Sequence, residues 1–501
     1  MVAEMSSAKK SAGKTLKTLA FDLGAESGRA VLGGFNGENL TLEEVHRFPN
    51  PPVAVLDGLH WDTLRLWNEI KQGIRLVIQK HGPDLASLGI DTWGVDFGLL
   101  AADDTLISNP FHYRDHRTDG ILEKAFAIIP QWEIYRRTGI QFLQLNSIFQ
   151  LLAMVLANSP SLRSAKTFLN TPDLFNFWLS GRKTSERTIA STTQLLNPNT
   201  GGWCRELMQR LSIPTHIFGE IVPSGTNLGE VRPMIAEETG CRRTQVIAPG
   251  GHDTASAVVA VPLESPDALW LSSGTWSIIG VELDQPIITR EGMQAGMTNE
   301  GGVNNTIRFC TNIVALWLAQ ECRRKWHTEG KEYSYDEITT LAEQAPPFTA
   351  LIHTGDARFL APGDMPARIQ TYCREKGQRV PETHAAILRC IFESLAFEYR
   401  TVAESIERMA GRKLPVIHAV GGGSRNRLLN QFTANATRRT VIAGPTEATA
   451  TGNILMQLIT LGELASLKEA RMLVHRSSEL QIYHPQNASA WEEAYSRYLK
   501  L

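Results

Sequence analysis

The stretch LKTLAFDLGAESGRAVL, residues 16–32, decides the fold of this chain. Residues 16–22 form an apolar run typical of a strand, residues 23–29 are mostly small and polar, and residues 30–32 are apolar again. Two apolar runs that flank a short polar turn predict a β-hairpin. Glycine in such a turn lets a ligand approach the backbone, and clustered amides and hydroxyls form a concavity that binds anions.

The same plan recurs in the middle of the chain, in the stretch ALWLSSGTWSIIGV, residues 268–281. Residues 272–275, Ser-Ser-Gly-Thr, separate two apolar runs, so a second hairpin with a second anion-binding turn is expected. The chain therefore resembles two copies of one unit, whose two turns are together suited to hold one polyphosphate.

Strand and helix patterns alternate after the hairpins, which is typical of an α/β fold. Residues 62–80 carry apolar side chains at helical spacing, and residues 86–91 are predicted to form a buried strand. Residues 414–420 are a further candidate for a parallel strand, and they run directly into GGGSRN, residues 421–426. Ligands of open α/β sheets bind at such strand ends.

The length of 501 residues exceeds what one hydrophobic core usually organises, so at least two domains are expected. The segment 262–267, rich in Pro, Ser and acidic residues, is the candidate crossing between them. We predict a flexible tail at 1–17, an N-terminal domain at 18–262 and a C-terminal domain at 263–501, with a ligand cleft between the domains.

Composition and charge narrow the classes of partner. The chain is 43% hydrophobic, and its 50 basic and 52 acidic residues give a net charge of -2, so neither nucleic acid nor a membrane is expected to bind it. The first residues lack the apolar run of a secretory signal, which favours the cytoplasm. Six scattered cysteines without a CxxC pair predict buried free thiols, and a pairing of Cys373 with Cys390 is left open.

Residues 8–15, AKKSAGKT, fit a relaxed phosphate-loop pattern. A phosphate loop must follow a buried strand and open a helix, whereas here a polar tail precedes the motif and a strand-like run follows it. The motif is therefore rejected as a nucleotide site.

Several short motifs, taken in their order along the chain, resemble the FGGY family of carbohydrate kinases, although the string FGGY itself does not occur. Each motif is a weak signal alone, but the set spans nearly the whole chain. The motifs are DLGA at 22–25, SGR at 27–29, DTWGVDF at 91–97, YRD at 113–115, GIQF at 139–142, HDTASA at 252–257, SSGTWS at 272–277, TNEGG at 298–302 and VGGG at 420–423.

The resemblance implies two ribonuclease H-like domains of the actin-like ATPase superfamily that flank a central cleft. It also implies ATP-dependent phosphorylation of a sugar, with Mg2+ screening the phosphate charge, by a monomer or weak homo-oligomer. The kinases it resembles most act on the 1-hydroxyl of L-rhamnulose in L-rhamnose catabolism, giving L-rhamnulose 1-phosphate and ADP. Kinases of L-fuculose, L-ribulose, xylulose or glycerol are the alternative, and a non-kinase actin-like ATPase switch is a more remote one.

Asp253 is the predicted catalytic base, because phosphorylation of a sugar needs a carboxylate that orients the attacking hydroxyl and accepts its proton. His252 and Thr254 are expected to flank the sugar. As an alternative, Asp253 caps a helix that begins near Thr254. Asp22 is the predicted anchor for hydrated Mg2+, with a turn-forming Asp at a strand end as the alternative.

The nucleotide is expected at the two hairpin turns and at the glycine run. Arg29 offers a forked positive donor to phosphate, or is alternatively a solvated charge of the hairpin. A tight turn is the alternative role for the glycine run. The predicted nucleotide contacts are Ala25, Glu26, Ser27, Gly28, Arg29, Thr275, Gln320 and Gly422.

Sugar recognition needs polar groups that pair with several hydroxyls beside a flat apolar wall. Asp96 and Gln141 are polar candidates next to Trp93, while the aromatic rings of Trp93, Phe97 and Phe142 belong either to the pocket or to the core. The resemblance favours Gly94 and Asn312 most. The predicted substrate contacts are Gly94, His252, Asp253, Thr254 and Asn312.

Overall fold

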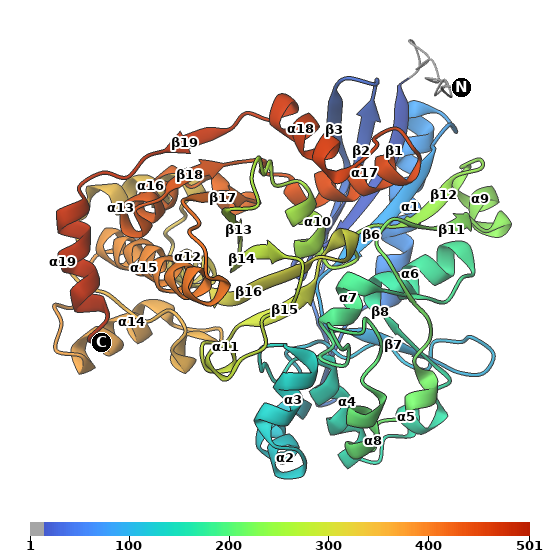
Figure 1. Ribbon diagram of the computed structural model, residues 1–501, viewed down its shortest axis with the longest axis horizontal. Coiled ribbons are helices and arrows are strands. Elements are labelled where there is room, and N and C mark those ends of the chain that lie inside the picture. Colours follow the sequence, from blue (N-terminus) through green and yellow to red (C-terminus); the bar gives the residue numbers. More distant parts are fainter. Residues whose placement is uncertain (1–14) are drawn as a thin grey trace, which may run out of the picture.

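Two mixed β-sheets organise residues 15–501, the part of the chain that the computed structural model describes (Figure 1). The first sheet has the order β11-β12-β6-β1-β2-β3, and the second has the order β15-β16-β14-β13-β17-β18-β19. The strands of the first sheet are β1 (Leu16–Leu23), β2 (Ser27–Phe35), β3 (Leu40–Pro49), β6 (Ser87–Thr92), β11 (Thr226–Glu230) and β12 (Gln245–Ala248). Those of the second are β13 (Ala268–Ser273), β14 (Trp276–Leu283), β15 (Thr298–Gly301), β16 (Ile307–Val314), β17 (Val416–Val420), β18 (Thr440–Ala443) and β19 (Gln481–Tyr483).

Both sheets repeat one topology. In the first, β1, β2 and β3 are antiparallel, and β1 continues into the parallel strands β6 and β12. In the second, β13, β14 and β16 are antiparallel, and β13 continues into the parallel strands β17 and β18. Both predicted hairpins, the α/β class and the repeat of one unit are therefore confirmed.

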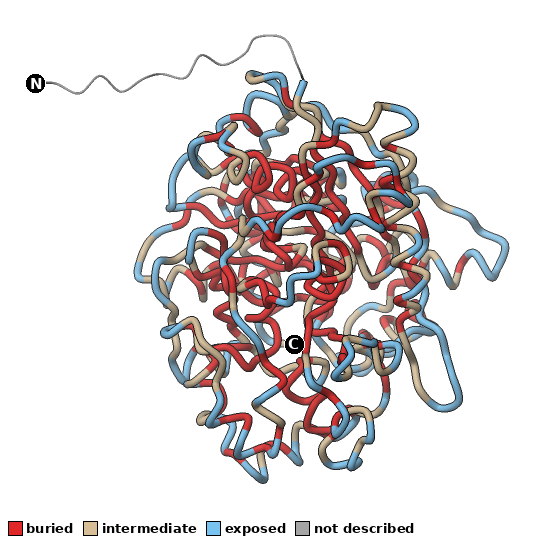
Figure 2. The backbone as a smooth tube through the Cα atoms, turned by 90° about the vertical axis from the view of Figure 1, so that its right-hand side faces the viewer, coloured by how far each residue is buried: buried red, intermediate tan, exposed pale blue. Residues whose placement is uncertain are grey.

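Alternation along the first strand of each sheet explains the layers. In β1, Leu19 and Phe21 belong to the core beneath helix α1 (Thr63–His81), whereas Ala20 belongs to the core shared with helix α17 (Ala448–Thr460). In β13, Leu269 belongs to the core that includes α15 (His384–Ala410), whereas Trp270 belongs to the core shared with α17. Successive strand residues point to opposite faces, so each sheet buries both of its faces. Figure 2 shows the buried backbone running through the interior of the molecule.

The helices cover these faces. The predicted helix 62–80 is α1, which begins after Asp62, whose carboxylate accepts a hydrogen bond from the amide of Arg65. Helices of the first lobe are α1 (Thr63–His81), α2 (Ile121–Ile128), α3 (Gln131–Thr138), α4 (Ser147–Leu156), α6 (Thr171–Ser180), α7 (Arg187–Ser191), α8 (Arg205–Arg210) and α9 (Pro233–Thr239). Those of the second are α12 (Trp317–Thr328), α13 (Tyr335–Gln344), α14 (Met365–Glu375), α15 (His384–Ala410), α16 (Arg427–Thr437), α18 (Leu467–Ser477) and α19 (Ala488–Tyr498).

Helices α10 (Asp253–Val259) and α17 (Ala448–Thr460) pack against each other between the two sheets. They cross so closely that a Cβ on Gly452 would lie 1.7 Å from the carbonyl oxygen of Ser256. Although α17 is near the end of the chain, it also contacts β1 and β6 of the first sheet. One core therefore joins the two lobes, and the predicted boundary at 262/263 stays a prediction about the chain's division.

Three further predictions concern the N-terminal segment, membrane-spanning helices and the cysteines. The strand β1 begins at Leu16, as the hairpin predicts, so residues 16–17 belong to the strand and not to the predicted tail at 1–17. Residues 1–14 of that tail, and with them most of the motif at 8–15, lie outside the described residues. No helix within residues 15–501 is long and apolar enough to cross a membrane. All six cysteines are free, with Cys373 and Cys390 forming a hydrogen-bonded pair of buried thiols.

We predict that Gly452→Ala destabilises the protein by about 3 kcal/mol or more, because its methyl group has no space against the backbone of α10. The free energy of unfolding in urea measures this loss. Gly355→Ala is the matched control, because a Cβ at Gly355 meets no atom within 4 Å. Equal stability of the two variants would contradict the close crossing.

Candidate functional site

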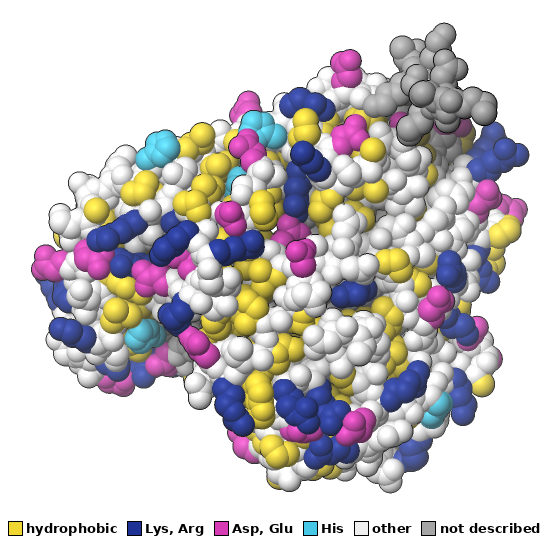
Figure 3. Space-filling view, in the orientation of Figure 1, with side chains coloured by type: hydrophobic (Ala, Val, Ile, Leu, Met, Phe, Trp, Pro, Cys, Tyr) yellow, Lys and Arg dark blue, Asp and Glu magenta, His cyan; other side chains and the backbone are white. Residues whose placement is uncertain are grey.

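A cavity of about 1430 Å³ lies between the lobes and is lined by both hairpin turns. In Figure 3 the surface is hollowed where the lobes meet. Among the predicted nucleotide, metal and substrate contacts, Gly28 alone does not line this cavity, and a Cβ on it would lie 2.3 Å from the ring of Phe48. Its backbone contact with the nucleotide stays a prediction. The other predicted residues line the cavity, namely Asp22, Ala25, Glu26, Ser27, Arg29, Gly94, His252, Asp253, Thr254, Thr275, Asn312, Gln320 and Gly422.

Three carboxylates gather at the carboxyl ends of the parallel strands of the first sheet. Asp22 near the end of β1 stands directly opposite Asp91 near the end of β6. Asp253 follows β12, the next strand of the sheet, after a short loop. In this loop the carbonyl of Gly251 accepts a hydrogen bond from the backbone amide of Thr92 at 2.9 Å. Carboxyl ends of parallel strands share one edge, so the topology itself brings these side chains together.

Asp253 is the open member of this group. Its side chain is 31% exposed, toward the cavity. Oδ1 accepts hydrogen bonds from the amide and the hydroxyl of Thr254 and lies 3.4 Å from Nε2 of His252, whereas Oδ2 has no hydrogen-bond partner within residues 15–501. His252, not Asp253, is the N-cap of α10, so the alternative capping role is wrong.

Burial raises the pKa of Asp253, and the nearby charge of Asp22 adds to this effect against the opposing influence of His252. Burial and Asp22 likewise raise the pKa of Asp91, whose Oδ2 accepts a hydrogen bond from Asn453 on α17 at 2.6 Å. A raised pKa makes a carboxylate a better proton acceptor, which suits Asp253 to general-base chemistry.

Arg29 joins the first hairpin turn to the second lobe. Its Nε and Nη2 donate to Oδ2 of Asp22 at 2.9 and 2.7 Å, and its Nη1 pairs with Glu447 just before α17. Burial opposes the charge of Arg29, but these two carboxylates outweigh it and raise the pKa of the guanidinium. Arg29 is therefore not a solvated hairpin charge. Glu447 was missed, because only the packing of α17 brings it to the turn.

The glycine run separates into structural and accessible positions. Gly421 has φ of +84°, and a Cβ on Gly423 would lie 2.8 Å from the carbonyl oxygen of Ser273, so both are required by the turn. A Cβ on Gly422 meets no atom within 4 Å, which leaves this backbone open to a ligand. The tight-turn alternative thus explains two of these glycines and not the third.

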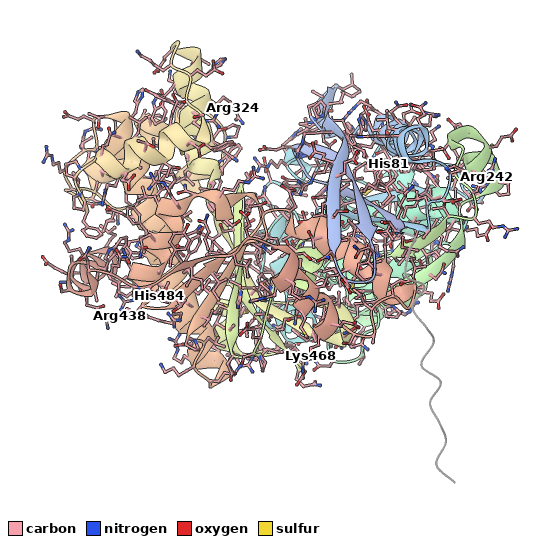
Figure 4. All side chains as sticks on the ribbon, turned by 90° about the horizontal axis from the view of Figure 1, so that it is seen from above. His81, Arg242, Arg324, Arg438, Lys468 and His484 are labelled. Atoms are coloured by element: carbon pink, nitrogen blue, oxygen red, sulfur yellow. The ribbon has the colours of Figure 1, made fainter. Side chains whose placement is uncertain are left out.

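The helix α12 forms the wall beside this turn. Gln320 lines the cavity, and its Oε1 is a buried oxygen without a hydrogen-bond partner among the described residues. Arg324, one turn later on α12, also lines the cavity, and Figure 4 shows it on the side of the second lobe that faces the first. The unpaired amide oxygen and the nearby cation suit a polar, anionic ligand such as a nucleotide.

Sugar candidates come from both lobes. Gln141 of the first lobe accepts a hydrogen bond at 3.1 Å from the amide of Asn312 on β16, and both line the cavity. Gly94 lies against Thr192, where a Cβ would be 3.2 Å from that side chain. Trp93 lines the cavity and is also a buried member of the first-lobe core, so its ring belongs to both.

Asp96 does not contact the cavity. Its carboxylate accepts hydrogen bonds from the indole nitrogens of Trp61 and Trp93 at 2.5 and 2.9 Å and from the amide of Gln150 at 2.9 Å. Its prediction as a sugar ligand is wrong; it fixes the back of the Trp93 ring instead. Phe97 belongs to a hydrophobic core, and Phe142 packs against the same core, so neither ring contributes to the pocket.

A second buried cluster lies behind His252. Arg308 on β16, fully buried, donates from Nη2 to Nδ1 of His252 at 3.0 Å and from Nε to the Gly301 carbonyl at 3.0 Å. The same Nη2 lies 2.9 Å from Oε2 of Glu300 on β15, an oxygen that is also 3.2 Å from Nδ1 of His252. Burial disfavours the Glu300 carboxylate, but Arg308 and His252 outweigh it and lower its pKa to about 2. The sequence pattern includes Glu300 in the motif at 298–302 but does not single out Arg308.

The donor set around Asp22 fits a hydrated cation that brings its own phosphate and water ligands. No group of three or more His, Cys, Asp or Glu side chains between residues 15 and 501 is arranged to hold a metal by itself. Asp22 faces the cavity beside the phosphate-binding turn. One carboxylate next to a polyphosphate is the arrangement that Mg2+ uses when phosphates and water supply its other ligands, so the residues fit this ion.

The chain matches two sequence families. Residues 17–260 match the FGGY family of carbohydrate kinases, N-terminal domain, and residues 269–461 match its C-terminal domain. A rhamnulokinase from Bacteroides thetaiotaomicron is 45% identical over 476 residues, which is 95% of this chain and 97% of the relative. A rhamnulokinase from Bacillus subtilis is 37% identical over 469 residues, with coverages of 93% and 95%.

Solved structures share the fold at low sequence identity. The xylulose kinase from Lactobacillus acidophilus superposes with a TM-score of 0.80 at 18% identity, covering 97% of both chains. The Plasmodium falciparum glycerol kinase with ADP gives 0.78 at 16%, covering 98% of both chains. The predicted fold of two related α/β domains around a central cleft is confirmed.

Burial raises the pKa of Asp96 from its ordinary 3.8 to about 6. The folded state then holds a proton that the unfolded state releases, so this group's contribution to stability falls as pH rises from about 4 to about 6, by about 3 kcal/mol. We predict that the stability of Asp96→Asn lacks this dependence on pH, because an amide cannot ionise. Urea unfolding of both proteins at pH 4 and pH 7 measures it, and an identical pH dependence would contradict the raised pKa.

Proposed function

The chain belongs to the FGGY family of carbohydrate kinases, and we propose that it transfers the γ-phosphoryl group of ATP to the 1-hydroxyl of L-rhamnulose. The products are L-rhamnulose 1-phosphate and ADP, as part of L-rhamnose catabolism in the cytoplasm. Likeness to curated rhamnulokinases over nearly the whole chain supports this choice of sugar. Monomer or weak homo-oligomer stays our prediction for the assembly.

One observation carries the proposal. The open carboxylate of Asp253 lies in the same cavity as both hairpin turns and the accessible glycine Gly422. An acceptor hydroxyl at Asp253 and a polyphosphate held between the turns would therefore meet inside one cavity. This is the arrangement that in-line phosphoryl transfer requires, because its catalysis rests mainly on positioning and charge stabilisation.

The side chains divide the work between the two substrates. Oδ2 of Asp253 is free to accept the hydrogen bond of the 1-hydroxyl and takes its proton as the new bond to phosphorus forms. On the sugar side, His252, Thr254, Gly94 and Asn312 line the space around that hydroxyl, and Gln141 links Asn312 to the first lobe.

On the nucleotide side, Ala25, Glu26, Ser27 and Thr275 supply the turns, while Gln320 and Gly422 form the wall beyond them. Arg29 supplies a fixed positive charge. Asp22 would hold Mg2+ that arrives with ATP, and this ion would neutralise charge on the phosphates.

The substrate is tested by ADP release with Mg-ATP against L-rhamnulose, L-fuculose, L-ribulose, L-xylulose, D-xylulose and glycerol, each beside a control without sugar. We expect the highest kcat/KM with L-rhamnulose, because the chain is similar over nearly its whole length to curated rhamnulokinases. A preference for another sugar would overturn the substrate and leave the kinase chemistry intact. ADP release that does not depend on sugar would favour a nucleotide switch.

Asp253→Asn should lower kcat by about 10²- to 10⁴-fold, since the isosteric amide cannot accept the proton. ATP binding should persist, because the phosphate-binding turns lie elsewhere; calorimetric titration with a non-hydrolysable ATP analogue measures it. Asp57→Asn, at an exposed hairpin tip, is the control. Near-normal turnover of Asp253→Asn would contradict the assignment of the base.

A further inference from the structure

His252 connects the carboxylate of Asp253 to a buried ion pair that belongs to the other sheet. Its Nε2 faces Oδ1 of Asp253 at 3.4 Å, while its Nδ1 receives the hydrogen bond of Arg308. The imidazole is mostly buried, with 9% of its side-chain surface exposed. Each ring nitrogen therefore has a defined neighbour, and the proton can occupy only one of them in the neutral ring.

Arg308 decides which nitrogen carries the proton. A guanidinium has donors and no acceptor, so its hydrogen bond requires a lone pair on Nδ1 of His252. The ring proton then resides on Nε2, which lies 3.4 Å from Oδ1 of Asp253. The opposite tautomer would place a lone pair of Nε2 against that carboxylate and an N–H of Nδ1 beside the guanidinium, with Oε2 of Glu300 at 3.2 Å as the acceptor of Nδ1–H.

Glu300 holds Arg308 in this role. Its Oε2 lies 2.9 Å from the same Nη2 that bonds His252, and the Gly301 carbonyl fixes Nε of Arg308. Without Arg308, the Glu300 oxygen that lies 3.2 Å from Nδ1 would instead accept a proton from that nitrogen. The carboxylate thus favours the wrong tautomer by itself and the right one only through the arginine.

We propose that Arg308 and Glu300 are positioning residues that fix the Nε2–H tautomer of His252. The Nε2–H then steadies Oδ1 of Asp253, so that Oδ2 stays turned toward the acceptor hydroxyl. This inference rests on the proposed role of Asp253 as the base. It assigns a catalytic purpose to an ion pair that would otherwise serve only to join β15 and β16.

A double-mutant cycle distinguishes the positioning of His252 by Arg308 from a purely structural role of the ion pair in joining β15 and β16. His252→Gln keeps an amide donor near the position of Nε2 and has no tautomer to set. We expect Arg308→Met to lower kcat by about 10- to 100-fold in the native background, in the range of lost outer-shell partners, with the KM for ATP nearly unchanged. In the His252→Gln background the same change should cost less than about threefold, because the two residues act through each other.

Arg439→Met is the matched control, because Arg439 is also buried, pairs with Glu407 at 2.9 Å and donates to the Leu414 carbonyl, away from the cavity. It should lower stability and leave kcat unchanged. If Arg308→Met does not fold, replacing both Arg308 and Glu300 with Met removes the stranded charge, a change that buried ion pairs often tolerate. Equal losses of kcat from Arg308→Met in both backgrounds would overturn the proposal.

Nitrogen NMR of histidine-labelled protein reads the tautomer directly, with the His252 signals assigned by their loss in His252→Gln. We expect a protonated Nε2 in the native protein and a shift of the proton to Nδ1 in Arg308→Met. A protonated Nδ1 in the native protein would overturn the proposal. This spectrum does not depend on turnover, so it stays decisive even if Asp253→Asn shows that the proposed base is wrong.

Discussion

The crossing of α10 and α17 is the constraint on which the site depends. Gly452 lets the two helices approach until only a glycine fits against Ser256. Each helix begins a few residues before this contact, so fixing the crossing also fixes both helix starts. Asp253 is the first residue of α10, and Glu447 directly precedes α17. One close contact therefore sets the position of the acceptor-side carboxylate and of the carboxylate that pairs with Arg29.

The second requirement is electrical. Asp22, Asp91 and Asp253 share one edge of the first sheet, where burial and the charge of Asp22 raise the pKa of both Asp91 and Asp253. Arg29 compensates Asp22, the amide of Asn453 binds Asp91, and Arg308 compensates Glu300. Asp253 lines the cavity with its Oδ2 unpaired among the described residues, whereas Asp91, whose Oδ1 is also unpaired, is fully buried and does not line the cavity.

Much of this arrangement could be predicted, because it depends on short stretches of sequence. The hairpins, the strand ends and the turns of Gly, Ser and Thr depend on short patterns, and they placed Asp22, Asp253 and Thr275 in the cavity before any tertiary contact was known. Asp96 failed as a sugar ligand because an aspartate in a motif looks the same whether it faces a ligand or a neighbouring side chain.

The residues that were missed show the other limit. Glu447 and Arg308 lie far along the chain from the side chains they contact, Arg29 and His252, and only the packing of both sheets against α10 and α17 brings them together. No spacing rule links such positions. Arg308 follows the motif at 298–302, and a charged residue in such a segment indicates a contact within the site. Which residue it contacts is known only from the fold.

The lobe that supplies each wall of the cavity also bears on specificity for the sugar. Gln141 and Asn312 meet across the seam between the lobes, whereas the anion-binding turns are formed within single hairpins. Residues on the seam can change without disturbing either hairpin, because their side chains carry no ladder hydrogen bonds. The scaffold can therefore keep one phosphate site while its sugar site varies, which is the physical reason that one fold serves kinases of several sugars. In the proposed site, sugar selectivity therefore depends in part on how the two lobes are held together.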